Sequence, residues 1–124
     1  MKRCAIYVRV STEEQAREGF SVRDQISRLR RFASEQGWDV EVFVDEGYSG
    51  KDMQRPGLQR LIDAIVEGRV DVLLISDIDR LSRNIRDQED IKELLRTHGV
   101  ELWKPYEKFD IPVSYTHLTL PTTE

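Results

Sequence analysis

The alternation of short apolar runs with stretches of helical period is the feature that most constrains the fold of this 124-residue chain. The apolar runs are rich in residues that favour strands, whereas the stretches between them repeat apolar residues every three or four positions. The expected strands cover residues 4–10, 40–44, 70–75 and 100–103, and the expected helices cover residues 22–36, 56–67 and 84–98. Helices that alternate with strands indicate a parallel sheet covered on both faces. We therefore expect an α/β domain of three layers, with a mostly parallel sheet of about four to five strands.

The limits of the expected helices are marked by proline and glycine. Pro56 suits the first position of a helix, where its missing N–H costs nothing. A glycine follows each helix, at Gly37, Gly68 and Gly99. We expect the apolar residues of the third helix to lie on its inner face: Ile85, Ile91, Leu94 and Leu95.

The composition limits the classes of protein that the chain can represent. Hydrophobic residues make up 39% and charged residues 34%, which suits one globular domain. The net charge of −4 means that any DNA contact must depend on a local cluster of arginines or on a further domain. The single cysteine, Cys4, forms no internal disulfide and fits a reducing cytoplasm. No apolar stretch approaches the ~20 residues of a membrane span.

The last residues of the chain differ in composition from the rest. Residues 114–124 contain four threonines and one charged residue, whereas residues 1–113 carry 41 of the 42 charges. We therefore expect a domain over residues 1–112 and a non-native tail over residues 113–124.

Polar side chains follow the ends of the first three expected strands, where ligands bind in parallel α/β sheets. Arg9 and Ser11 end the first strand, and a loop with Tyr48, Ser49 and Arg55 follows the second. The third strand is followed by Asp77, Asp79, Arg80 and Arg83. A hydroxyl beside several guanidinium groups suits phosphoryl transfer, because arginine stabilises the charge that gathers on an attacked phosphate. Asp79 could orient an arginine or carry a proton.

These clusters resemble the active-site motifs of the serine recombinases, which include resolvases, invertases and large serine integrases. Residues 7–12 (YVRVST), with Gln15 close behind, are similar to the opening of their active site. Residues 79–83 (DRLSR) resemble their second arginine motif, and residues 48–50 with Arg55 resemble the loop that supplies a further catalytic arginine. Residues 19–25 resemble the start of the first helix in the large integrases and transposon enzymes.

The resemblance implies a specific reaction. Ser11 would attack the scissile phosphate of double-stranded DNA to form a 5′-phosphoserine intermediate, and strand exchange and religation would follow without a cofactor or a metal. The residues that match the phosphate-binding arginines are Arg9, Arg55, Arg80 and Arg83, and those that match supporting polar groups are Gln15, Gln25 and Asp79.

The resemblance also implies partners and a location. The full-length protein would form a homodimer and a synaptic homotetramer, in the cytoplasm of a bacterium and encoded by it or by a phage. The family continues with a long helix and DNA-binding domains, which residues beyond Asp110 do not resemble. We therefore expect this chain to be truncated and unable to recombine DNA alone.

Two alternatives remain open from the residues. Asp77 and Asp79, with Asp45 or Glu46, could bind Mg²⁺ in a nuclease or phosphotransferase, although such a site favours acidic residues at the first strand end as well. The chain could also be an inactive α/β fragment. Ser11 alone fits a helix cap, with a glutamate three positions later.

Overall fold

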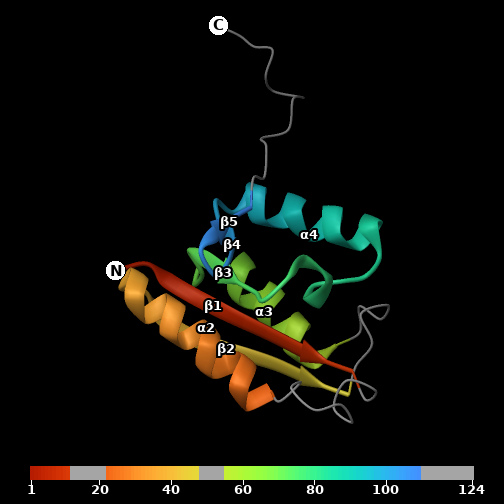
Figure 1. Ribbon diagram of the computed structural model, residues 1–124. Helices are drawn as coiled ribbons and strands as arrows, with labels where there is room; N and C mark the ends of the chain where they lie inside the picture. The colour runs from red at the N-terminus through yellow and green to blue at the C-terminus, as the bar shows by residue number, and fades with distance from the viewer. Residues whose placement is uncertain (12–21, 48–54, 110–124) are drawn as a thin grey trace, which may run out of the picture.

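The computed structural model describes residues 1–11, 22–47 and 55–109, and these ranges form one α/β unit around a five-stranded sheet (Figure 1). In chain order the elements are β1 (Arg3–Val10), α2 (Val22–Gln36), β2 (Asp39–Glu46), α3 (Pro56–Val66), β3 (Val72–Leu74), the short 3-10 helix η1 (Ile78–Arg80), α4 (Ile85–Thr97), β4 (Glu101–Lys104) and β5 (Glu107–Lys108). The strand order is β2-β1-β3-β4-β5, with β1 to β4 parallel and β5 antiparallel to β4. The expected mostly parallel sheet is confirmed.

β1 lies in the middle of the sheet, and its two neighbours pair with different lengths of it. β2 pairs with all of β1, from Arg3 opposite Asp39 to Val10 opposite Glu46. β3 pairs only with its first half, from Cys4 to Ile6. The second half of β1 therefore has no strand on its β3 side, and η1 contacts β1 there.

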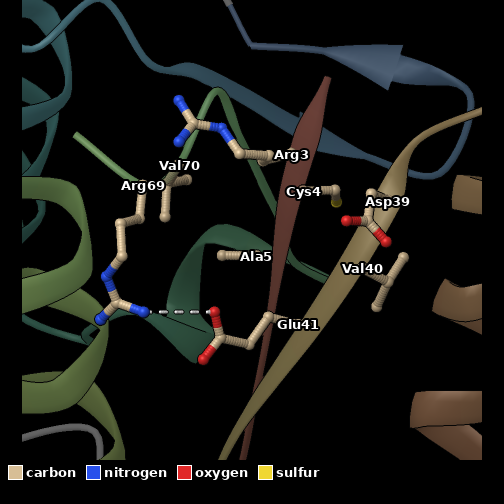
Figure 2. Close-up of a pocket in the computed structure, with 8 residues that line it drawn as sticks. All are labelled: Arg3, Cys4, Ala5, Asp39, Val40, Glu41, Arg69 and Val70. Carbon is tan, nitrogen blue, oxygen red and sulfur yellow. Dashed lines mark ion pairs between the residues drawn. The ribbon is translucent and has the colours of Figure 1, made fainter. Parts of the chain in front are cut away.

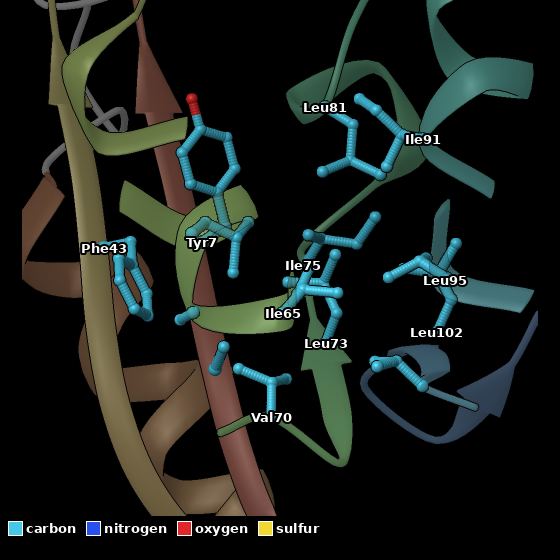
Figure 3. Close-up of a cluster of buried hydrophobic side chains, with 14 of the residues drawn as sticks. Tyr7, Phe43, Ile65, Val70, Leu73, Ile75, Leu81, Ile91, Leu95 and Leu102 are labelled. Carbon is cyan, nitrogen blue, oxygen red and sulfur yellow. The ribbon is translucent and has the colours of Figure 1, made fainter. Parts of the chain in front are cut away.

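Side chains of β1 alternate between two apolar cores, one on each face of the sheet. Cys4, Ile6, Val8 and Val10 belong to the core under α2. Ala5 and Tyr7 belong to the other core, which contains buried residues of α3 and α4 (Figure 3). The sheet is thus covered by α2 on one face and by α3 and α4 on the other, which gives the three layers expected.

The expected helices begin and end close to the observed residues. α2 covers the expected range, and the glycine after each helix adopts a positive φ of 66–77° that favours this residue type. Asn84 caps α4 by accepting a hydrogen bond from the Arg86 N–H at 2.8 Å. No helix in the described ranges is long and apolar enough to cross a membrane.

Three expectations about the elements were wrong in detail. β3 is three residues long instead of six. Val70 and Ile75 are buried beyond its ends, and the Ile75 N–H still donates to the Trp103 carbonyl of β4 at 2.9 Å. Ile85 is 74% exposed. It lies six positions before Ile91, and at ~100° per residue this places it about 120° away from the buried face. β5 was not expected as a strand, since it contains only two charged residues, Glu107 and Lys108.

Candidate functional site

The carboxyl ends of the parallel strands bring four distant parts of the chain together. Arg9 is the next-to-last residue of β1, and Ser11 directly follows that strand. Arg55 directly precedes α3, and η1 follows β3. In Figure 1 the arrowheads of β1 and β2 point to this end of the molecule.

Arg9 and Arg80 hold each other's backbone. The Arg9 guanidinium donates from Nε to the carbonyl of Arg80 at 3.2 Å and from Nη2 to the carbonyl of Asp79 at 3.1 Å. In return, Nη1 of Arg80 donates to the carbonyl of Arg9 at 2.7 Å. Both side chains are buried, with Arg9 at 0% and Arg80 at 8% exposure. These reciprocal bonds fix η1 against the end of β1, across 71 positions of sequence.

Arg55 is fully buried and binds the same turn from the α3 side. Its Nη1 donates to the carbonyl of Arg80 at 3.2 Å and to the hydroxyl of Tyr7 at 3.1 Å, and its Nη2 donates to the carbonyl of Leu81. The guanidinium carbon lies 5.7 Å from the centroid of the Tyr7 ring, which adds a cation–π contact. Two buried arginines therefore bind the backbone of residues 79–81.

Asp45, at the end of β2, is the buried anion of this site. One of its carboxylate oxygens accepts hydrogen bonds from the Tyr7 hydroxyl at 2.7 Å and from the Leu58 N–H at 2.9 Å, and the other accepts from the Gly57 N–H at 2.7 Å. Asp45 thus caps α3, whose N-cap residue Arg55 makes no capping bond with its own side chain.

Tyr7 links the arginine and the aspartate. Burial raises the pKa of Tyr7 far above its ordinary value, although the Arg55 and Arg9 guanidiniums lower it and the Asp45 carboxylate raises it further. The hydroxyl therefore stays protonated and donates to Asp45. In Figure 3 this hydroxyl points toward the carboxyl end of β1. We expected Asp45 only as a possible metal ligand. The signal that could have identified Asp45 as a cap is the N-terminus of α3, where the N-cap residue Arg55 offers no capping side chain.

Gly57 permits this capping geometry. A Cβ at this position would lie 2.6 Å from the carbonyl oxygen of Val44 and 2.9 Å from both carboxylate oxygens of Asp45. Only a residue without a side chain lets the start of α3 approach the end of β2 this closely.

The remaining site residues expected from the sequence are more scattered. Ser11 and Asp79 are half-buried, and an Asp79 carboxylate oxygen lies 3.7 Å from Nε of Arg80. Arg83 is exposed, and Gln25 is 8% exposed on α2. Gln15 lies outside the described residues, as does the loop that contains Tyr48 and Ser49.

The carboxylates proposed for a magnesium site have other roles in the described ranges. Asp45 is engaged by three donors, and Asp77 caps η1 by accepting a hydrogen bond from the Ile78 N–H at 2.8 Å. No group of three His, Cys, Asp or Glu side chains able to hold a metal ion occurs among the residues described.

Comparison with known protein families agrees with this site. The sequence profile of the resolvase N-terminal domain matches residues 4–118. The chain belongs to the resolvase family.

This resolvase domain is similar to mobile-element and bacterial recombinases. It is 42% identical over 98 residues to a putative DNA recombinase of Bacillus subtilis (strain 168), a match covering 79% of this chain and 19% of the relative. It is 34% identical over 96 residues to the transposon Tn501 resolvase of Pseudomonas aeruginosa, covering 77% of this chain and 43% of the relative. The chain thus spans less than half the length of either protein.

A solved structure shows the same fold. The N-terminal catalytic domain of TP901-1 integrase superposes with a TM-score of 0.74 at 38% identity, over 83% of this chain and 76% of that chain. This resolvase domain is therefore a catalytic domain of the serine recombinase type, as expected. The family match continues to residue 118, beyond the boundary that we expected at residue 112.

The other end of the strands, away from the candidate site, contains a hollow. A hollow of about 210 Å³ lies beside the first residues of β1 and β2, lined by Arg3, Cys4, Ala5, Asp39, Val40, Glu41, Arg69 and Val70 (Figure 2). Three of its charged side chains are in ion pairs, with Nη1 of Arg69 at 3.7 Å from Glu41 and Nε of Arg3 at 3.1 Å from Asp71. It lies at the end of the strands away from Ser11 and Arg55.

Proposed function

We propose that this resolvase domain cleaves and rejoins DNA through Ser11, with the buried arginines at the same sheet edge stabilising the attacked phosphate. The observation that carries the proposal is a convergence of buried positive charge on the sheet edge that Ser11 follows. Among the described residues, the guanidiniums of Arg9, Arg55 and Arg80 are all buried, and their hydrogen bonds hold them at the end of β1 and at residues 79–81. Guanidiniums gathered beside a hydroxyl favour an anionic substrate at this edge, in a chain whose net charge is −4.

The proposed chemistry is a transesterification at phosphorus. The Oγ of Ser11 forms a bond to the scissile phosphorus, the bond from phosphorus to the 3′ oxygen breaks, and the serine proton passes to that oxygen. The 5′-phosphoserine keeps the energy of the broken ester, so the reverse step rejoins a strand without a cofactor. The alternation along β1 supports a Ser11 hydroxyl on the side of the sheet that carries Tyr7 and Arg9.

The arginines would act by position and charge. A guanidinium stays charged at any ordinary pH and matches phosphate oxygens with paired N–H groups. The hydrogen bonds to residues 79–81 support guanidiniums that are held in fixed positions. Because Arg9 and Arg55 are fully buried, they would meet the phosphate only after the groups that cover them move. Exposed Arg83 would contact the phosphate from the solvent side, Gln15 and Gln25 would support the site, and Asp79 would orient Arg80 or carry the proton.

Strand exchange is proposed only for a longer protein. Its relatives extend well beyond the matched region, so the dimer, the synaptic tetramer and target recognition would depend on segments downstream of this domain. Double-stranded DNA is the proposed substrate, in the cytoplasm of a bacterium.

The test is covalent trapping on DNA. The protein with its native downstream sequence is incubated with an end-labelled duplex that carries a nick near the cleavage site, and denaturing gels report adducts. We expect an adduct for the unaltered protein and for Ser76→Ala, an exposed serine beyond β3, and none for Ser11→Ala. An adduct that persists in Ser11→Ala would refute the assignment, and cleavage lost in EDTA would support the magnesium alternative.

A further inference from the structure

We propose that one face of α2 binds the phosphate backbone of the DNA duplex next to the cleavage point, an inference that rests on the proposed function. This face, the arginine stripe, consists of exposed Arg23, Arg30 and Arg31. They lie seven and eight positions apart, so at ~100° per residue they fall within a sector of about 100° on the helix. Exposed Ser27 and Ser34 fall in the same sector.

The stripe carries positive charge and no carboxylate of its own; Glu35 lies four positions after Arg31 and accepts a hydrogen bond from the Tyr106 hydroxyl at 3.0 Å. The sector of the stripe contains no carboxylate, because the acidic residues of α2, Asp24 and Glu35, lie on the neighbouring flank. In the described part of the chain, the side chains of the three arginines form no hydrogen bond and no ion pair. On α4, by contrast, Lys92 and Arg96 each pair with a glutamate three positions earlier.

The stripe begins at the same end of the sheet as the candidate site, on the face that α2 covers. α2 starts at the edge where β1 and β2 end and runs back along the sheet (Figure 1). Arg23, in its first turn, is therefore the stripe residue nearest to the edge that carries Arg9 and Ser11. A duplex whose scissile phosphate lies at that edge could continue along the helix.

The dimensions and chemistry of the stripe suit a nucleic-acid backbone. Eight residues of helix rise about 12 Å, which equals three to four base-pair steps of about 3.4 Å. Arginine and serine are common donors to phosphate oxygens, and such contacts set the position of a duplex without reading its sequence. The position of the stripe at the same end of the sheet as a site proposed to hold phosphate favours DNA over an acidic surface of a second copy of the chain.

The experiment measures how salt weakens DNA binding by the 124-residue chain. Fluorescence anisotropy follows its binding to a labelled duplex of arbitrary sequence between about 50 and 200 mM salt. Each lost phosphate contact should lower the slope of log K against log salt by about 0.9. The triple variant Arg23→Gln, Arg30→Gln, Arg31→Gln should therefore lose about 40-fold less affinity over this range than the unaltered chain.

The matched control is Arg28→Gln, which removes the same charge from the flank that holds Asp24 and Glu35. Arg30→Gln should lower the slope by about 0.9, whereas Arg28→Gln should leave it unchanged. Equal slopes for the triple variant and the unaltered chain, equal effects of Arg28→Gln and Arg30→Gln, or no binding by the unaltered chain would each overturn the inference. Sedimentation of the unaltered chain and of the triple variant tests whether the stripe instead contacts a second copy of the chain. If the triple variant loses self-association but keeps its DNA affinity, the stripe is a protein contact and the inference is overturned.

The two proposals can fail separately. If Ser11 forms covalent adducts but the stripe variants bind DNA like the unaltered chain, only this inference is wrong. A stripe-dependent salt slope without any adduct would remove the catalytic proposal and leave the stripe as a DNA contact.

Discussion

Replacing Asp45 by alanine should lower the free energy of unfolding by about 3 kcal/mol, because one buried carboxylate serves three donors. Loss of the cap on α3 contributes about 0.5–2 kcal/mol. Loss of the acceptor for the buried Tyr7 hydroxyl contributes a further ~1–3 kcal/mol, since that group then lies unsatisfied in the core. The two effects sum to roughly 1.5–5 kcal/mol. Urea titration followed by circular dichroism measures the change.

Three further variants make this reasoning testable. Tyr7→Phe removes only the hydroxyl and should cost ~1 kcal/mol. The double variant should cost less than the sum of the two single variants by about 0.5–3 kcal/mol, because phenylalanine leaves no hydroxyl to be orphaned. Asp63→Ala, at an exposed position on the same helix, should stay within about 0.5 kcal/mol. Strict additivity of the Tyr7 and Asp45 changes, or equal effects at Asp45 and Asp63, would refute the proposed network.

Two other predictions concern packing and burial. Gly57→Ala should lower the unfolding free energy by about 1–3 kcal/mol, because its Cβ would meet Val44 and Asp45 at 2.9 Å or less, whereas Gln59→Ala on the exposed side of α3 should be nearly neutral in the same titration. Cys4 should resist a thiol reagent at pH 8 until the chain unfolds, since it is 2% exposed and burial raises the pKa of its thiol from 9.0 to about 12. Because the unfolded thiol ionises first, stability should fall as the pH rises from about 9 toward 12. Rapid labelling of the native chain would contradict this.

The helices and most strands could be predicted because their signals are local. The period of α2 and the glycines after the helices depend on neighbouring residues alone. Ile85 was wrongly assigned to the inner face of α4, because it was judged by its apolar side chain alone and not by its angle from Ile91 around the helix. β5 escaped prediction since the turn before it depends on Tyr106, a residue at φ 66° whose type does not indicate a turn.

The candidate site could also be predicted only in part from the sequence. The positions of Arg9, Arg55 and Arg80 at one edge followed from strand order, and the structure brings these three together. Their hydrogen bonds did not follow, because each joins residues 25 to 71 positions apart. Asp45 shows this most clearly, since it caps a helix 12 positions later only because β2 ends beside the start of α3.

The central position of β1 has a consequence for how the domain forms during synthesis. β1 leaves the ribosome first, yet its partners β2 and β3 begin 36 and 69 residues after it. Contacts of such long sequence separation slow folding, because the intervening chain must close into a loop before they form. The Arg9–Arg80 bonds need still more chain, as η1 is made after β3. Ser11, the proposed nucleophile, is therefore translated before Arg55 and Arg80, which can join it only after most of the domain has emerged.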